Sequence, residues 1–140
     1  MLLFQLEKPS QIKNAKDALP YLENIRGEEQ EHFKVIFLNG NHKVTGAKVI
    51  TKGLLNSCSV HPREVFKEAI IRGSASIVIA HNHPSGNTQP SHADREITQK
   101  LSEAGEIIGI QVLDHIIVTE EDYYSFKEQG SFPEETRKWK

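Results

Sequence analysis

Residues 74–94 read Ser-Ala-Ser-Ile-Val-Ile-Ala-His-Asn-His-Pro-Ser-Gly-Asn-Thr-Gln-Pro-Ser-His-Ala-Asp. The apolar run 77–80 is bounded by Ser and Gly and predicts a buried strand that ends in His81-Asn82-His83. Because strand side chains alternate, we expect His81 and His83 on one face and Asn82 on the other. The Pro, Ser, Gly and Asn residues that follow predict a turn.

A helix is expected to begin at Ser91, with Asp94 in its first turn. Two imidazoles and one carboxylate would then converge just beyond the end of the strand. This is the ligand set of a catalytic zinc, which has three protein ligands and a fourth position for water. Ser91 and Asp94 also have the spacing of a capping box, and the two roles of Asp94 are compatible, because its two oxygens can have different partners.

Composition limits the alternatives. The chain has 140 residues, a net charge of -2 and one cysteine, Cys58, so it shows no basic footprint for nucleic acid and no intrachain disulfide. We expect Cys58 to be a buried thiol. No apolar stretch approaches the length of a membrane span, and Met1–Leu6 followed by Glu7 makes a poor signal peptide. The prediction is a soluble cytoplasmic protein with a single globular domain.

Two helices and three strands are expected before the central strand. Residues 10–26 have helical spacing, although Pro20 indicates a break or a later start near Asp17. Residues 31–50 predict a hairpin with a turn at 39–41, and 53–61 a short third strand. A helix is then expected from Pro62 to Gly73.

Beyond the turn, the helix from Ser91 is expected to end near Ala104, with Gly105 as its stop. Residues 107–110 and 112–118 predict strands, and the aromatic residues of the polar tail 120–140 are expected to cover a sheet edge. This order of elements predicts the α/β class, as an α/β/α sandwich with a mixed, curved central sheet.

The chemistry also needs a carboxylate that is not a zinc ligand, to take a proton from zinc-bound water and deliver it to a leaving amine. Glu31 is the candidate, but alternation alone does not separate it from Glu29, since both would share a face. Ser91 could donate a hydrogen bond to the developing oxyanion, or it could simply be an N-cap. His61, His92 and His115 are expected to be structural, solvent-facing or cleft-lining rather than ligands.

The spacing His81-x-His83-Pro, six residues, Ser91, two residues, Asp94 resembles the JAMM signature of the JAB/MPN metalloproteases. The full string 81–94 looks like the RadC branch in particular. The other stretches that resemble RadC are Glu31-His-Phe, Val60-His-Pro-Arg-Glu-Val and Asp114-His-Ile-Ile-Val. The resemblance implies a cytidine-deaminase-like α/β/α fold, zinc held by His81, His83 and Asp94, catalysis by Glu31, and transition-state stabilisation by Ser91.

This interpretation divides the chain into a helical N-terminal extension 1–27, a RadC-like JAB/MPN domain 28–132 and a mobile tail 133–140. The expected function is a zinc-dependent metallopeptidase or isopeptidase, with one Zn²⁺ and a peptide or protein substrate. The alternatives are a RadC-like binding module in DNA-repair or mobile-element complexes and, least supported by charge, a nuclease. The ligand set would also accept iron, cobalt or nickel.

Overall fold

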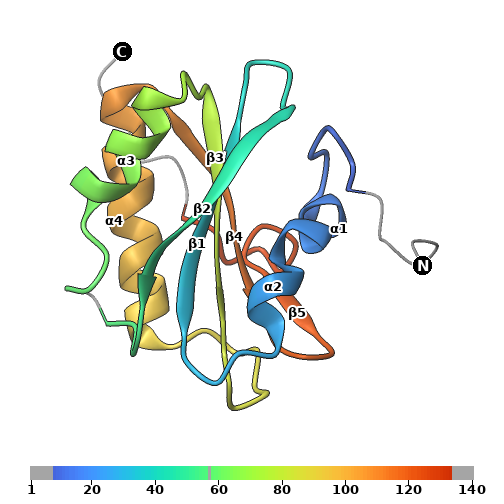
Figure 1. The fold of residues 1–140 in the computed structure, drawn as a ribbon. Coiled ribbons are helices and arrows are strands. Elements are labelled where there is room, and N and C mark those ends of the chain that lie inside the picture. The colour runs from blue at the N-terminus through green and yellow to red at the C-terminus, as the bar shows by residue number, and fades with distance from the viewer. Residues whose placement is uncertain (1–7, 57, 134–140) are drawn as a thin grey trace.

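The computed structural model describes residues 8–56 and 58–133. Its centre is a five-stranded sheet in the order β2-β1-β3-β4-β5 (Figure 1). The strands are β1 (His32–Leu38), β2 (Val44–Lys52), β3 (Ser76–Asn82), β4 (Gln111–Val118) and β5 (Tyr123–Ser125). β3 and β4 are parallel and the other neighbouring pairs are antiparallel, so the sheet is mixed, as predicted.

Helices cover both faces of the sheet, which confirms the α/β/α sandwich (Figure 1). One face packs against α3 (Pro62–Ile71) and α4 (His92–Ile108), through residues such as Phe33, Ile79 and Ile97. The other packs against the N-terminal helices, through Ile36 and Val78 among others. Every residue of β1 and β3 is therefore buried, which explains the continuous apolar runs at 35–38 and 77–80 within these strands.

The N-terminal segment is not one helix. It forms α1 (Ala15–Ala18), the 3-10 helix η2 (Leu19–Leu22) and α2 (Glu23–Arg26). Pro20 lies in the first turn of η2, where its missing N–H is tolerated, so the break expected at this proline is present. No helix within the described residues is long and apolar enough to cross a membrane.

The predicted strand over 53–61 is wrong. β2 ends at Lys52, and Gly53 then adopts a φ of 115°, a conformation that residues with a side chain rarely take. The described residues after Gly53 run as a loop to α3, and Cys58 in this loop is exposed rather than buried. The loop returns towards the start of β1, where the Gly53 N–H donates to the Glu31 carbonyl at 2.8 Å.

The helix after the turn is longer than predicted. α4 continues through Gly105 and ends at Gly109, whose φ of 87° is left-handed. Gly105 is needed for a different reason, because a Cβ there would overlap the carbonyl oxygen of Ile110 as the chain turns back into β4. The predicted strand 107–110 is therefore wrong, because its first two residues end α4 and its last two form the turn into β4. The aromatic segment expected to cover a sheet edge includes a strand of its own, β5, which pairs with β4. Most of the tail predicted to be mobile, residues 134–140, lies outside the described residues.

Candidate metal centre

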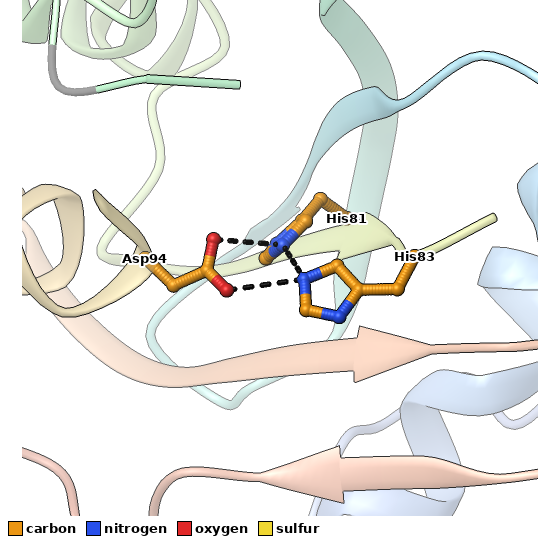
Figure 2. A group of neighbouring side chains, drawn as sticks. All are labelled: His81, His83 and Asp94. Atoms are coloured by element: carbon orange, nitrogen blue, oxygen red, sulfur yellow. Dashed lines mark hydrogen bonds and ion pairs between the residues drawn. The ribbon is translucent and has the colours of Figure 1, made fainter. Parts of the chain in front are cut away.

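The end of β3 and the start of α4 bring His81, His83 and Asp94 together (Figure 2). His81 Nε2 lies 3.0 Å from Asp94 Oδ1, and His83 Nε2 lies 3.1 Å from Asp94 Oδ2. The two Nε2 atoms are 2.9 Å apart. Among the described residues, this is the one group of three or more His, Cys, Asp or Glu side chains placed to share a metal ion.

The chemistry of these atoms fits a cation. His83 Nδ1 lies 2.7 Å from the Asn87 carbonyl oxygen, which can only accept, so Nδ1 carries a proton. In the neutral ring, Nε2 then bears a lone pair that points at the Asp94 carboxylate and at His81 Nε2. Lone pairs this close repel one another unless a positive charge lies between them. A divalent ion held by two imidazoles and a carboxylate would supply that charge.

The electrostatics favour a carboxylate at this place. Burial by itself would raise the pKa of Asp94, but the contacts with the His81 and His83 imidazoles and with the Ser91 N–H hold the pKa far below its usual range. Burial would likewise lower the pKa of His83, but the Asp94 carboxylate and the Asn87 carbonyl outweigh it and raise the pKa. Asp94 is therefore ionised at neutral pH, as a metal ligand must be.

Asp94 also has its helix-capping role. The Ser91 N–H donates to Asp94 Oδ2 at 2.7 Å, and the Asp94 N–H donates to Ser91 Oγ at 3.0 Å, which completes the capping box. Asp94 Oδ1 faces His81 instead. The cap thus fixes the carboxylate in the orientation that meets both imidazoles, so capping is compatible with the metal-ligand role predicted for Asp94.

Glu31 and Ser91 line the same cleft as His83 and Asp94 of the cluster. The cleft has a volume of about 630 Å³, and its wall includes Glu31, His83, Ser91 and Asp94. Glu31 precedes β1 directly, and its Oε1 accepts a hydrogen bond from the Leu55 N–H at 2.9 Å. Glu29 also lines the cleft, but its side chain is exposed. The loop after β2 thus orients the carboxylate of Glu31 beside the cluster.

Asn82, the middle residue of His-Asn-His, holds the backbone on both sides of Glu31. Its Oδ1 accepts from the His32 N–H at 2.6 Å, and its Nδ2 donates to the Gln30 carbonyl at 3.0 Å. Asn82 points away from the face of the two histidines and is fully buried. Sequence reasoning placed Asn82 on the opposite face but missed this role, because the partners lie some fifty residues away.

His61, His92 and His115 lie outside the three-residue cluster, as expected. His92 is 86% exposed at its side chain, and His61 caps α3 by accepting from the Arg63 N–H. His115 is fully buried and touches His81, which no local pattern around it revealed. Burial, and then the neighbouring His81, lower the pKa of His115 well below its usual value, so its ring is neutral.

Comparison with known proteins agrees with this geometry. A family model described as the RadC-like JAB domain matches residues 12–131. A UPF0758 protein of Bacillus cereus is 47% identical over 131 residues, which are 93% of this chain and 58% of the relative. Another, from a Geobacillus species, is 48% identical over 120 residues, or 85% and 53% of the two chains. This chain thus spans just over half the length of these relatives. By the extent of both matches, it belongs to the RadC-like JAB domain family.

Proposed function

We propose that the chain is a zinc-dependent hydrolase of the JAMM type, a metallopeptidase or isopeptidase. The observation that supports this most strongly is the meeting of two imidazole nitrogens and one carboxylate at a cleft that Glu31 lines together with His83 and Asp94. A metal site with only a structural role needs neither a cleft nor a neighbouring carboxylate outside the ligand set.

His81, His83 and Asp94 would hold the ion. Bound there, Zn²⁺ would supply a Lewis acid that lowers the pKa of a water from 15.7 to about 7. Zinc is the proposed metal, since imidazole and carboxylate ligands suit it well, although they would also accept iron, cobalt or nickel.

Glu31 is the proposed general base and acid. Its carboxylate accepts the proton of the attacking water and then delivers it to the nitrogen of the leaving amine, so that the proton is not lost to solvent. The Leu55 N–H donates to Oε1 of Glu31 and so helps to hold the carboxylate in the cleft. A correctly placed general base contributes roughly 10²–10⁴-fold to the rate.

Ser91 is the proposed oxyanion donor. Its Oγ accepts the Asp94 N–H, which leaves the hydroxyl proton free to point into the cleft. A donor at this position would stabilise negative charge on the former carbonyl oxygen of the substrate amide.

The substrate is proposed to be a peptide or protein. A net charge of -2 does not favour binding to nucleic acid. A cytoplasmic location remains a prediction from cysteine usage. The alternative is a binding module that retains the metal and performs little catalysis.

The test compares zinc-loaded wild type with Glu31→Gln and Glu29→Gln. The probe is a library of synthetic linear and lysine-branched peptides, and mass spectrometry detects new termini. We expect cleavage by wild type and Glu29→Gln, and loss of at least ~100-fold in Glu31→Gln with zinc retained. Equal cleavage by Glu31→Gln would reject the mechanism, and no cleavage by any zinc-loaded protein would favour the binding module.

A further inference from the structure

A chain of hydrogen bonds runs behind His81, on the side away from the cleft. His81 Nδ1 lies 2.9 Å from His115 Nε2 on β4. His115 Nδ1 lies 2.5 Å from Thr98 Oγ1 on α4. The Thr98 hydroxyl in turn donates to the backbone carbonyl of Asp94 at 2.7 Å. The chain therefore starts at one residue of the cluster and ends on the backbone of another, and its two middle members are fully buried.

The far end of the chain fixes the direction of every proton in it. The Asp94 carbonyl can only accept, so Thr98 gives it the single hydroxyl proton. The oxygen of Thr98 must then accept from His115 Nδ1–H. A neutral His115 with its proton on Nδ1 has a lone pair on Nε2, and this lone pair accepts from His81 Nδ1–H. His81 is left with a bare Nε2, the atom that faces Asp94.

The opposite direction is disfavoured. It would turn the Thr98 proton towards His115 and leave two oxygen lone pairs facing each other at the 2.7 Å separation of Thr98 and Asp94. It would also place a proton on His81 Nε2, where Asp94 Oδ1 at 3.0 Å could accept it, but this proton would have to leave before any metal could bind. Packing holds the rings in place, because His115 stacks on Phe126 with centroids 4.7 Å apart.

We propose that His115 and Thr98 are positioning residues for the metal, which keep the proton of His81 on Nδ1 and leave Nε2 free to bind the ion. This proposal depends on the metal site of the proposed function. It gives a function to His115 and Thr98, two buried polar residues that do not line the cleft. Phe126, which follows β5, contributes to the site as well, because its ring stacks on that of His115.

Thr98→Val tests the direction of the chain, because valine has nearly the same shape but no hydroxyl. Without an acceptor, His115 Nδ1–H would be a buried unpaired donor, so the proton of His115 should move to Nε2 and that of His81 to its own Nε2. Thr98→Ser keeps the hydroxyl and is the matched control. Long-range ¹H–¹⁵N NMR of the metal-free proteins, above pH 8, reports the tautomer of His81 directly. Competition with a chelator reports the zinc affinity.

We expect the Nδ1–H form of His81 in wild type and Thr98→Ser, and the Nε2–H form in Thr98→Val. Zinc affinity should fall roughly 10–100-fold in Thr98→Val, as is common when a partner of a metal-binding histidine is lost. His115→Phe keeps a ring against Phe126 but accepts no hydrogen bond, so it should also weaken zinc binding. His115→Gln, whose carbonyl can accept from His81, should restore part of the loss.

The proposal is overturned if Thr98→Val and His115→Phe, folded as judged by urea unfolding, bind zinc as tightly as wild type. It is also overturned if the tautomer of His81 does not change in Thr98→Val. Failure of wild type to bind zinc would instead reject the proposed function, and the NMR measurement on metal-free protein would still decide the direction of the hydrogen-bond chain.

Discussion

Glu31 and Leu55 both line the cleft and are joined by a hydrogen bond of 2.9 Å, in which the Leu55 N–H donates to Glu31 Oε1. The Gly53 N–H donates to the Glu31 carbonyl in the same way. The loop after β2 therefore binds Glu31 through both its side chain and its backbone. An exposed acid at a strand end would move freely, whereas these two hydrogen bonds hold Glu31 in the cleft that it shares with His83 and Asp94.

Gly53→Ala should disturb this loop. The φ of 115° is unfavourable for alanine although its Cβ would meet no other atom, so the cost is backbone strain of about 1–3 kcal/mol. We expect slower hydrolysis with unchanged zinc affinity, because the carboxylate of Glu31 is displaced but the ligands are not. Gly40→Ala is the control, since Gly40 has an ordinary φ and open space around it. Identical kinetics in the two variants would contradict the role of the loop.

Asn82→Ala should separate catalysis from metal binding. The variant leaves the buried His32 N–H without its acceptor, which should lower the free energy of unfolding by about 1–3 kcal/mol. The backbone around Glu31 then loosens, so kcat should fall more than zinc affinity does. Urea unfolding, chelator competition and peptide hydrolysis measure the three effects. Loss of zinc binding with unchanged kcat in the zinc-saturated protein would show that Asn82 supports the ligands instead.

Ser91→Ala tests two roles at once. Loss of the N-cap should cost about 1 kcal/mol in the free energy of unfolding. Loss of an oxyanion donor should lower kcat by roughly 10²–10³-fold at saturating zinc. Ser91→Thr keeps the hydroxyl and should restore most of both. If Ser91→Ala is less stable but hydrolyses peptides at the wild-type rate, Ser91 is only a helix cap.

Asp114 predicts a pH dependence of stability outside the metal site. Burial raises the pKa of this carboxyl, despite hydrogen bonds from Ser125, Lys127 and His115. Between the unfolded pKa of about 3.9 and the raised folded pKa, the folded chain binds more protons than the unfolded chain. The free energy of unfolding contributed by Asp114 should therefore fall as pH rises through that interval.

Urea unfolding of zinc-free wild type and Asp114→Asn from pH 4 to pH 7 would measure this contribution. Asparagine does not ionise, so the difference between the two proteins isolates Asp114. We expect the wild type to lose stability relative to Asp114→Asn as pH rises. If the stability of wild type minus that of Asp114→Asn stays constant or increases as pH rises, the raised pKa of Asp114 is contradicted.

The core of this fold could be predicted because its signals are local. The run 77–80 could only be a buried strand, and the period of two then places His81 and His83 on one face. Pro62 and Gly73 bracket α3 closely. Asp94 follows from the capping pattern with Ser91, so all three residues of the cluster lie within fourteen residues of sequence.

The parts that could not be predicted depend on distant contacts. Gly105 looks like a helix stop, yet it allows the close approach of the Ile110 carbonyl. Alternation leaves Glu29 and Glu31 equivalent, and only the resemblance to RadC selects Glu31; its hydrogen bond with the Leu55 N–H is a distant contact that no local pattern predicts. The hydrogen bond between His81 and His115 joins two strands, so no sequence pattern within either strand predicts it.

The central claim is that His81, His83 and Asp94 share one metal ion, and zinc stoichiometry tests it most directly. Elemental analysis of the purified chain after incubation with zinc and removal of excess should give one zinc per chain for wild type. It should give none for His83→Ala or Asp94→Ala, both checked for folding. A wild-type chain that retains no zinc, or variants that retain as much as wild type, would contradict the account.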